Sequence, residues 1–534
     1  MPTTRPWFHH AVLYQIYPRS FFDADPDGTG DLKGIVQKLD YLRGKPHSLG
    51  VDAIWLSPFY PSPMADFGYD VADYCDVDPL FGTLKDFDTL VAEAHKRDIR
   101  VLIDLVANHT SAHHPWFEES SSSKKNPKRD WYVWRNPKPD GSPPNNWLSI
   151  FGGSAWEFDS TTGQYYLHGF LKEQPDLNWE NPEVRKAIRG VMRFWLDKGV
   201  DGFRIDAVQW LGKDPQLRDD PPNPEYDPKK DPPYQALRHI HSKRWPNMFT
   251  YLKELTDMAK TYKDRLLIAE AYPHKRFEYG EYLKLYEKVD PTILAPFNFE
   301  GIFLPWKAKA FKKYIDGFQA RLLPKYLPVY AIGNHDNRRL VARFGPKAAR
   351  TIAVLLLSLP GIPVVYYGDE LGMDDVRVHK GQVRDPLARI FFGGAGRDPE
   401  RTPMQWTPGK WAGFSRIASW LPVSKSRKVN VQSELKDPRS LLNLYRTLLA
   451  FRSTSQAMQH GTYRPIECYD QDLFAFAREF GEERLAIVLN FSSTKRIESP
   501  VEGKVIASTH GVMSATKKLR PLEGRIIQTE GSET

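Results

Sequence analysis

The sequence predicts an α/β fold, a (β/α)8 barrel in which eight parallel strands alternate with helices. Short apolar runs rich in β-branched residues recur along the chain. Most of these runs are followed by a stretch with apolar residues at three- and four-residue intervals, which is the period of an amphipathic helix. At 534 residues the chain also exceeds the size at which single cores stop growing, so two or three domains are expected.

Eight apolar runs are the predicted strands. They lie at 12–18, 52–58, 101–108, 202–207, 266–271, 293–299, 329–336 and 362–370. Helical periodicity follows in stretches such as LKGIVQKLDYLRG and EVRKAIRGVMRFWLDKG. Strands that alternate with helices favour a closed parallel barrel.

The alternation breaks twice, which predicts the domain boundaries. About seventy residues rich in Ser, Pro, Trp and Asn separate the third and fourth strands, and DLFAFARE and RLAIVLNFS near the C-terminus predict antiparallel strands. The barrel is therefore expected at 1–106 and 175–459, an inserted subdomain at 107–174, and a C-terminal antiparallel β-domain at 460–534.

Composition narrows the possible partners. The formal charge of +8 is spread along the chain, and its densest cluster, KKNPKRD at 124–130, is short, so we expect a solvated surface and no nucleic-acid partner. Cys75 and Cys468 are too far apart to suggest a disulfide framework. No apolar run reaches membrane-spanning length, and the N-terminus has no apolar signal core. We expect a cytoplasmic monomer or homodimer without a membrane partner.

An acidic loop, DADPDGTGDL, occupies residues 23–32. Its spacing follows the start of an EF-hand calcium loop, with Gly28 at the sharp turn, but Gly34 stands where the closing glutamate is needed. Taken by itself, the loop is either a solvated acidic turn or a site for a hard cation.

Polar residues stand at the ends of four predicted strands. They are Asn108 and His109, Arg204 and Asp206, Glu270, and the run Asn334, His335 and Asp336. A lone member of this set would more often be a satisfied cap or ion pair. Active sites of barrel enzymes lie at the carboxyl ends of the strands, and paired carboxylates without a phosphate-binding loop are typical of glycoside hydrolysis.

These strand ends carry motifs of a known family. VLIDLVANH (101–109), DGFRIDAV (201–208), IAEA (268–271) and GNHD (333–336) occur in the family's order. The chain thereby resembles the α-amylase superfamily of glycoside hydrolases over essentially its whole length. QPDLN (174–178), DFGYD (66–70) and GRDPERTPMQW (396–406) resemble its oligo-1,6-glucosidase and α-glucosidase branch, most of all the bacterial α-glucosidases.

The resemblance implies roles for the three strand-end carboxylates. Asp206 would be the nucleophile, Glu270 the general acid/base, and Asp336 a third carboxylate that grips sugar hydroxyls. Arg204, two residues from Asp206 on the same strand face, is expected to keep Asp206 ionised. The carboxylates around Glu270 are expected to raise its pKa, as an acid catalyst requires.

The resemblance also implies the substrate pocket. His109 and His335 would donate to the hydroxyls of a bound glucose, and Tyr69 would be the aromatic platform beneath it. Asp66 and Arg401 would pair across the closed end of the pocket and bind the terminal sugar. The alternative for that pair is a structural ion pair at the surface.

For the acidic loop, the resemblance favours the cation. It implies a structural Ca²⁺ or Mg²⁺ ion, with no organic cofactor. The ligands would be the carboxylates of Asp23, Asp25, Asp27 and Asp31 and the backbone carbonyl of Thr29.

Two departures from the family pattern bear on specificity. Ala207 follows the nucleophile, where relatives that prefer α-1,6 links tend to carry Val, so its small side chain favours α-1,4 links. The segment 211–234 is long and rich in Pro and Asp; it is either a disordered surface insertion or a wall over the acceptor side of the pocket.

The expected activity is that of a retaining, exo-acting α-glucosidase. It would release glucose from the non-reducing end of short α-1,4-linked saccharides, maltose and possibly sucrose, with transglucosylation. The alternatives are an oligo-1,6-glucosidase, a sucrose isomerase or trehalose synthase type of glucosyl transferase, and, from another class, a non-catalytic barrel scaffold. Hydrolysis and transfer share the covalent intermediate, so the motifs do not separate them.

Overall fold

The computed structural model describes residues 6–273, 277–389, 394–511 and 516–530. Its centre is a closed barrel of parallel strands in the order β1-β11-β10-β9-β8-β7-β3-β2. The strands are β1 (Leu13–Ile16), β2 (Ala53–Leu56), β3 (Arg100–Leu105), β7 (Gly202–Ile205), β8 (Leu266–Ala269), β9 (Leu294–Asn298), β10 (Val329–Ala331) and β11 (Ile362–Tyr366). Each overlaps one of the eight predicted runs, and the predicted fold class is confirmed.

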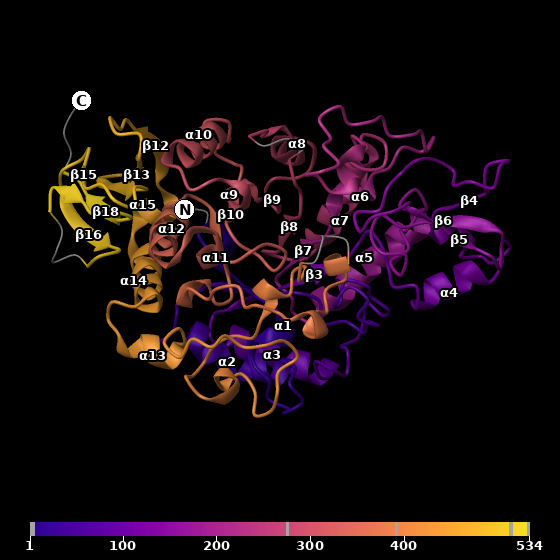
Figure 1. Ribbon diagram of the computed structural model, residues 1–534, viewed down its shortest axis with the longest axis horizontal. Coiled ribbons are helices and arrows are strands. Elements are labelled where there is room, and N and C mark those ends of the chain that lie inside the picture. The colour runs from indigo at the N-terminus through magenta and orange to yellow at the C-terminus, as the bar shows by residue number, and fades with distance from the viewer. Residues whose placement is uncertain (1–5, 274–276, 390–393, 512–515, 531–534) are drawn as a thin grey trace.

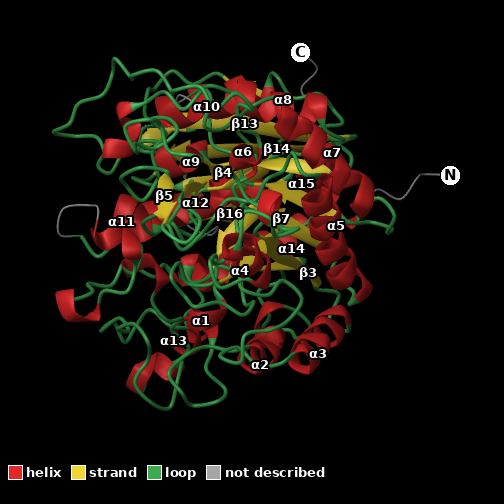
Figure 2. Ribbon diagram, turned by 90° about the vertical axis from the view of Figure 1, so that its right-hand side faces the viewer, coloured by secondary structure: helices red, strands yellow, loops and turns green. Residues whose placement is uncertain are grey.

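Amphipathic helices surround the barrel (Figure 2). The long ones are α2 (Leu32–Leu42), α3 (Leu84–His95), α5 (Pro182–Asp197), α7 (Asn247–Ala259), α8 (Gly280–Lys288), α10 (Ala308–Gln319), α12 (Pro346–Ser358) and α14 (Leu441–Thr454). Helix α5 illustrates why they form: Asn181 caps its first turn by accepting from the Glu183 N–H, and Pro182 occupies the first helical position. Its buried side chains recur at helical spacing.

Short helices lie in the connections. They are α1 (Pro18–Phe21), α4 (Pro115–Ser122), α6 (Val208–Leu211), α9 (Glu300–Phe303), α11 (Leu340–Phe344), α13 (Val431–Lys436) and α15 (Gln456–His460). Helices α1 and α6 follow barrel strands β1 and β7 directly, so they lie at the carboxyl ends of the strands.

The long connection between β3 and β7 contains a separate antiparallel sheet. Its order is β4-β6-β5, with β4 (Trp134–Arg135), β5 (Trp156–Asp159) and β6 (Gln164–Leu167). Trp147 and Trp156 are buried in a small apolar cluster of its own. The sheet falls within the predicted insertion and lies at one end of the molecule (Figure 1); the exact limits 107–174 stay a prediction.

The opposite end of the molecule is an antiparallel sheet, as predicted for the C-terminal region (Figure 1). Its order is β12-β13-β14-β18-β16. The strands are β12 (Thr462–Ile466), β13 (Leu473–Phe480), β14 (Glu483–Asn490), β16 (Lys504–Ser508) and β18 (Gly524–Gln528), and β15 (Ile497–Glu498) pairs with β17 (Lys518–Leu519). Helix α12 of the barrel contacts β14 and β18.

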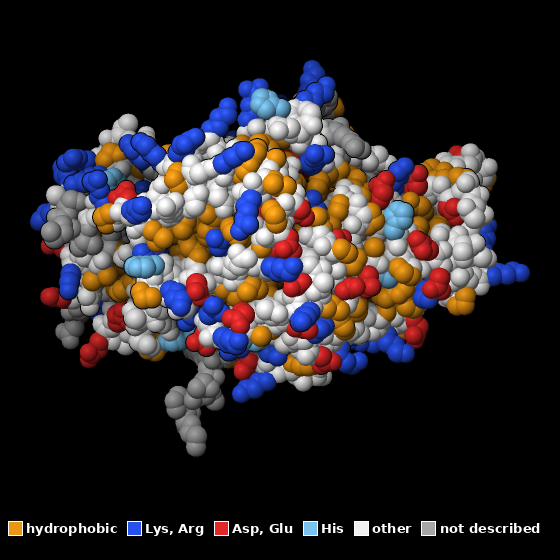
Figure 3. All heavy atoms as spheres, turned by 90° about the horizontal axis from the view of Figure 1, so that it is seen from below, with side chains coloured by type: hydrophobic (Ala, Val, Ile, Leu, Met, Phe, Trp, Pro, Cys, Tyr) orange, Lys and Arg blue, Asp and Glu red, His pale blue; other side chains and the backbone are white. Residues whose placement is uncertain are grey.

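The surface carries mixed charge. On the face drawn in Figure 3, Lys and Arg side chains are interspersed with acidic and apolar ones. In the basic cluster at 124–130, Lys128 is paired with Glu119 at 2.7 Å and Arg129 is buried. Cys75 and Cys468 are unpaired thiols. Within the ranges that the structure describes, no helix has the length and apolar character that crossing a membrane requires.

Candidate active site

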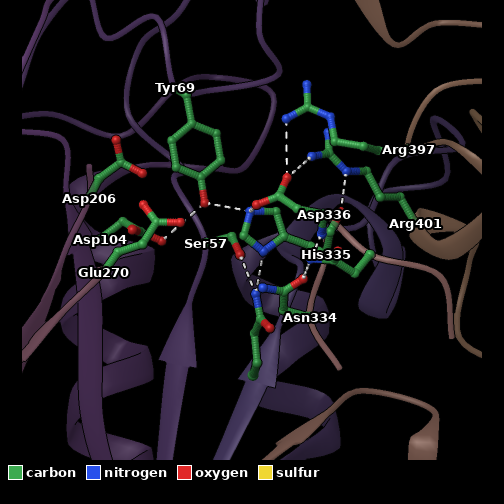
Figure 4. A network of polar contacts seen from close by, with 12 residues as sticks. Ser57, Tyr69, Asp104, Asp206, Glu270, Asn334, His335, Asp336, Arg397 and Arg401 are labelled. Atoms are coloured by element: carbon green, nitrogen blue, oxygen red, sulfur yellow. Dashed lines mark hydrogen bonds and ion pairs between the residues drawn. The ribbon is translucent and has the colours of Figure 1, made fainter. Parts of the chain in front are cut away.

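The barrel brings the predicted carboxylates together. Asp206 directly follows β7 and Glu270 directly follows β8, and these strands are neighbours in the barrel. Asp336 lies in the loop that follows β10. All three line one cavity of about 490 Å³ at the carboxyl ends of the strands, and Figure 4 shows them around Tyr69 and His335.

Arg204 connects the carboxylates. Its Nη1 lies 2.6 Å from Asp206 Oδ1 and 2.5 Å from Asp104 Oδ1, and its Nη2 lies 2.8 Å from Glu270 Oε2. Asp104 was not predicted as a site residue. In the sequence it can be recognised as an aspartate inside the apolar run that forms β3. Its other carboxylate oxygen, Oδ2, accepts from Trp55 Nε1 at 2.9 Å. One buried guanidinium therefore orients three carboxyl groups.

Burial has the largest effect on the pKa values of Asp206 and Glu270. It raises the pKa of Asp206 to about 7, although Arg204 acts in the opposite direction. It likewise raises the pKa of Glu270 to about 7, as expected for an acid catalyst. Arg204 acts on Asp206 in the expected direction, toward the ionised form, but burial has the larger effect on the pKa. Both carboxyl groups contact Arg204, so they titrate as a coupled pair.

Asp336 has the opposite surroundings. Burial acts to raise its pKa, but His335 in its protonated form, together with Arg397 and Arg401, holds the pKa well below its usual range. Arg401 Nη2 lies 2.8 Å and Arg397 Nη1 3.1 Å from Asp336 Oδ1. Burial lowers the pKa of His335 to about 3, so its ring is neutral. The site thus combines a carboxylate that is held ionised with two carboxyl groups whose pKa is raised.

The predicted sugar-binding side chains are arranged around Tyr69. Its hydroxyl lies 2.8 Å from His335 Nε2, and the two rings are stacked with centroids 5.5 Å apart. His109 Nε2 lies 3.1 Å from the Tyr69 carbonyl oxygen. Tyr69 and His109 line the cavity, whereas His335 lies behind them and contacts Asp336 Oδ2 at 3.3 Å. His335 is thus placed to orient Tyr69 and Asp336.

The ion pair predicted for the closed end of the pocket differs from the one in the structure. Asp66 Oδ1 pairs with Arg397 Nη2 at 2.7 Å, and no pair joins Asp66 to Arg401 among the described residues. Arg401 is fully buried and binds Asp336 and the His335 carbonyl oxygen instead. The predicted Asp66–Arg401 pair is therefore wrong. The alternative of a surface pair is also wrong, because Asp66 is buried and lines the cavity.

Arg397 was missed although it lies in the quoted GRDPER stretch. Asp385 Oδ1 holds its Nη2 at 2.7 Å, so the guanidinium is shared by Asp66, Asp336 and Asp385. The local sequence does not tell which of the two arginines pairs with Asp66. Arg397 follows a glycine and Arg401 follows a glutamate, and both lie within the same short stretch. Only the tertiary placement of the loop selects between them.

The outer part of the cavity is largely aromatic. Its aromatic lining residues are Phe151 and Phe170 from the insertion, Trp210 after β7, Tyr272 after β8, and Phe303 after β9. These side chains were not singled out from the sequence because an isolated aromatic residue is a weak signal. Apolar walls with a few polar groups are typical of small-ligand sites.

The segment 211–234 does not form the predicted wall. The structure describes all of it, and none of its residues lines the cavity; Gln235, Lys243 and Arg244 do. The segment packs on the insertion: Trp147 Nε1 donates to the Arg218 carbonyl at 2.9 Å, and Asn146 Nδ2 donates to the Asp220 carbonyl at 2.8 Å. Its alternative as a disordered insertion also fails, since these contacts fix it. The residue that directly follows the segment, Gln235, is the first after it to line the cavity.

Ala207 has a left-handed backbone. Its φ is 48° and its ψ 39°, which an alanine seldom adopts. Its N–H donates to Glu270 Oε2 at 2.8 Å. This conformation turns the chain from β7 into α6 and aims a backbone donor at the proposed acid.

The acidic loop makes many internal hydrogen bonds. Asp31 caps α2 by accepting from Gly34 N–H at 2.6 Å, and its other oxygen accepts from the Ala24 and Asp25 N–H groups. Asp25 also pairs with Lys33 at 2.7 Å. Gly28 has φ 92°, and a Cβ there would lie 2.3 Å from the Ala418 carbonyl oxygen, so the turn requires glycine.

The fit of this loop to a cation rests on a smaller set of oxygens. Asp23 Oδ2 accepts from the Gly28 N–H and Asp27 Oδ1 from the Thr29 N–H. Asp23 Oδ1 is buried without a hydrogen-bond partner in the part of the chain described. No group of three or more His, Cys, Asp or Glu side chains that could hold a metal occurs among the described residues. The oxygen chemistry fits a hard cation, and the site stays a prediction.

Fold and site together define a class of protein. A parallel barrel that brings three carboxyl groups together in one cavity at the carboxyl ends of its strands is typical of glycoside hydrolases. The model of the alpha amylase catalytic domain matches residues 15–461, and the chain belongs to the α-amylase family.

Relatives cover almost the whole chain. A probable alpha-glucosidase of Rhizobium meliloti (strain 1021) is 42% identical, over 96% of this chain and 94% of the relative. An oligo-1,6-glucosidase of Parageobacillus thermoglucosidasius is 38% identical, over 98% and 99%. Among solved structures, the alpha-glucosyl transfer enzyme XgtA has a TM-score of 0.87 at 37% identity, covering 99% of both chains. A single-residue mutant of the trehalulose synthase MutB in complex with Tris has a TM-score of 0.88 at 34% identity, covering 98% and 100%.

Proposed function

We propose that the protein is a retaining, exo-acting α-glucosidase that releases glucose from the non-reducing end of short α-1,4-linked saccharides. Maltose is the proposed main substrate, sucrose a second one, and transglucosylation a side reaction. The observation that carries the proposal is the cavity of about 490 Å³ whose lining joins the three carboxyl groups of Asp206, Glu270 and Asp336 to the ion pair of Asp66 and Arg397. In this proposal the Asp66–Arg397 pair closes the cavity behind the terminal sugar, so that a chain end fits it and the middle of a polymer does not.

The proposed chemistry uses the two carboxyl groups beside Arg204 in different protonation states. Ionised Asp206 attacks the anomeric carbon while protonated Glu270 gives its proton to the leaving oxygen, so one C–O bond forms as the glycosidic bond breaks. Glu270 then takes a proton from water or from a sugar hydroxyl, which displaces Asp206 and regenerates the pair. That one Arg204 guanidinium contacts both carboxyl groups supports the close spacing of a retaining enzyme.

The other site residues receive roles in binding. Asp336, held ionised by Arg397 and Arg401, accepts hydrogen bonds from sugar hydroxyls. Tyr69 supplies an apolar face for the sugar ring, with His109 beside it. The Asp66–Arg397 pair binds the terminal hydroxyls, and Arg401 acts through Asp336 and the backbone of His335.

A transferase is the second candidate, and the aromatic outer cavity favours it. Phe170, Trp210 and Tyr272 offer apolar faces on which an acceptor sugar can compete with water. The names of the similar structures, an alpha-glucosyl transfer enzyme and a trehalulose synthase, agree with this candidate, and the oligo-1,6-glucosidase relative keeps the 1,6 linkage as an alternative. A non-catalytic scaffold has no support, because all three carboxylates line the same cavity.

The experiment is a product analysis. The purified protein is incubated separately with maltose, isomaltose, sucrose, trehalose and maltotetraose, and the products are resolved by chromatography over time. Free glucose as the first product from maltose supports the proposal. Isomerised disaccharide from sucrose, or preference for isomaltose, would replace it with one of the alternatives. Absence of any product from all five sugars would refute an α-glucosidase.

Three further assignments belong to this proposal. We propose a structural Ca²⁺ or Mg²⁺ ion at the loop of Asp23, Asp25, Asp27, Thr29 and Asp31, supported by the oxygen donors and the unpartnered Asp23 Oδ1. We also propose a cytoplasmic location and a monomer or homodimer, which follow from the composition alone.

A further inference from the structure

Two cations line the catalytic cavity away from its closed end. Lys243 and Arg244 come from the connection between β7 and α7, and both line the cavity. Arg397, the remaining cation in the described lining, is held by three carboxylates at the closed end. Lys243 and Arg244 contact residues of the loops after β7 and β8, so they belong to the part of the cavity that would receive the leaving group or acceptor.

Lys243 is buried among aromatic rings. Its Nζ donates to Tyr234 Oη at 2.9 Å and lies 4.2 Å from the centre of the Trp210 ring. No carboxylate within the described residues forms an ion pair with it. Asp220 is the acidic group whose charge acts on Lys243. It already accepts from the His241 N–H, and its Oδ2 lies 3.5 Å from His239 Nδ1. Burial lowers the pKa of Lys243 well below its ordinary value.

Arg244 is held in a strained conformation. Its φ is 64°, in the left-handed region, and its N–H donates to the Gln209 carbonyl at 2.7 Å. Its Nη2 reaches the Tyr272 carbonyl at 3.4 Å, and the carboxylate of Glu281 is 3.7 Å from its Nε. That Nε is buried and makes no hydrogen bond within the described ranges. Strained residues with unsatisfied donors at a cavity wall are typical of binding sites.

The charges of the cavity are therefore separated. The carboxylates in its lining, Asp66, Asp206, Glu270 and Asp336, belong to the closed end and the catalytic centre. We propose that Lys243 and Arg244 form an oxyanion-binding acceptor site, so that the preferred leaving group or acceptor is a sugar carrying a phosphate or a carboxylate. This inference rests on the proposed glucosidase function and names its substrate class.

The guanidinium and the ammonium suit different parts of such a group. Arg244 has a planar guanidinium, whose Nε makes no hydrogen bond within the described residues and whose shape matches two oxygens of a phosphate or carboxylate, and Lys243 adds a point charge from the aromatic wall. Binding of an anion would favour the charged form of Lys243, so proton uptake is expected on binding. Gln209 and Gln235 in the same lining are neutral donors and do not repel an anion.

The test compares acceptors on the glucosylated enzyme. An aryl α-glucoside supplies the glucosyl group, and glucose, glucose 6-phosphate and glucuronate compete as acceptors at constant ionic strength. The transfer products are quantified by mass spectrometry. We expect glucose 6-phosphate, glucuronate or both to be used at least tenfold more efficiently than glucose by the wild type. The two anions distinguish a phosphate from a carboxylate preference.

Variants separate a binding role from a structural one. Arg244→Gln and Lys243→Gln are expected to bring the ratio of anionic to neutral acceptor efficiency to within twofold of one. Arg238→Gln, which removes an exposed arginine of the same segment outside the cavity lining, is expected to leave the ratio unchanged. An efficiency ratio near one in the wild type would overturn the inference. So would an unchanged ratio in Arg244→Gln.

A binding measurement keeps the inference separate from the proposed function. Calorimetric titration of the wild type with glucose 6-phosphate and with glucose reads the acceptor site even if no glucosyl enzyme forms. Preferential binding of glucose 6-phosphate that Arg244→Gln abolishes, without turnover of any α-glucoside, would refute the glucosidase and keep the anion site. Turnover of maltose together with equal binding of glucose and glucose 6-phosphate would support the glucosidase and refute the anion site.

Discussion

Arg397 Nη2 lies 2.7 Å from Asp66 Oδ1, and the same guanidinium reaches Asp336 Oδ1 at 3.1 Å through Nη1. One side chain therefore joins the closed end of the cavity to the carboxylate proposed to grip the substrate. Asp385 supports it from behind, through an oxygen 2.7 Å from Nη2. The terminal sugar and the reacting bond are thus positioned by a single network.

The first prediction concerns this network. Arg397→Gln should lower kcat/KM for maltose by on the order of 10–100-fold, because it leaves Asp66 and Asp336 buried with one cation fewer. Asp66→Asn should lower kcat/KM by less, since Arg397 keeps its ion pairs with Asp336 and Asp385. Steady-state kinetics on maltose measure both effects. Arg338→Gln, at an exposed ion pair with Asp375, serves as the control and should change little. Wild-type kinetics in Arg397→Gln would contradict the assignment.

The second prediction concerns the catalytic pair. Asp206→Asn should reduce kcat by on the order of 10⁴-fold or more on every substrate, because no nucleophile remains. Glu270→Gln should cost roughly 10²–10⁴-fold on maltose but clearly less on an aryl glucoside, whose leaving group needs no protonation. The measurement is the ratio of the two substrates for each variant. An equal loss on both substrates in Glu270→Gln would rule out its role as the acid.

The third prediction concerns pH. Activity requires Asp206 ionised and Glu270 protonated, and the pKa of each is raised to about 7. As pH falls below this range both carboxyl groups gain protons and the nucleophile is lost; as pH rises above it both lose protons and the acid is lost. The profile of kcat/KM should therefore be bell-shaped around neutral pH, with limbs that belong to the pair.

A variant of Asp104 tests the cause of this profile. The charge of Asp104 contributes to raising the pKa of Asp206. Asp104→Asn should move the acid limb to lower pH, because Arg204 then serves two carboxylates in place of three. Asp88→Asn, which removes an exposed carboxylate paired with Lys198, should leave both limbs in place. An acid limb that stays unmoved in Asp104→Asn would show that burial alone sets the pKa.

Much of this site could be predicted from the sequence, because strand-end residues inherit their position from the barrel. Asp206 and Glu270 meet wherever neighbouring parallel strands β7 and β8 end together, so their convergence needs no knowledge of the loops. Arg397 and Arg401 differ in this respect. Both lie on one loop, four positions apart, and their partners are set by how the loop folds over the barrel.

The lining of the outer part of the cavity was predicted only in part, because it too depends on how a loop folds over the barrel. The length and composition of 211–234 indicated a loop at the barrel mouth, but its hydrogen bonds to Asn146 and Trp147 turn it toward the insertion. Of the residues that follow, Gln235, Lys243 and Arg244 line the cavity. The direction of a long loop depends on tertiary contacts that local composition does not encode.

The fourth prediction concerns the acidic loop. Elemental analysis should find about one Ca²⁺ or Mg²⁺ per chain, and chelation should lower the melting temperature by several degrees, since a cation that binds only the folded state stabilises it by mass action. Asp23→Asn should abolish both the bound metal and the effect of chelation. Asp140→Asn, in an exposed turn of the insertion, is the control. A metal-free wild type with an unchanged melting curve would establish a hydrogen-bonded turn without a cation.

The fifth prediction concerns Ala207, whose φ of 48° places it in the left-handed region beside the nucleophile. Ala207→Val should raise the efficiency on isomaltose relative to maltose by on the order of 5–100-fold, the range for methylene-sized changes in a pocket. It should also destabilise the fold by about 1–2 kcal/mol, because a β-branched residue tolerates this conformation poorly. Ala207→Gly separates the two effects: glycine adopts the conformation without strain and adds no volume, so it should keep both the stability and the preference for maltose. The measurements are the ratio of kcat/KM for the two disaccharides and the melting temperature. If Ala207→Val is destabilised while its ratio equals that of Ala207→Gly, the side chain at this position does not select the linkage.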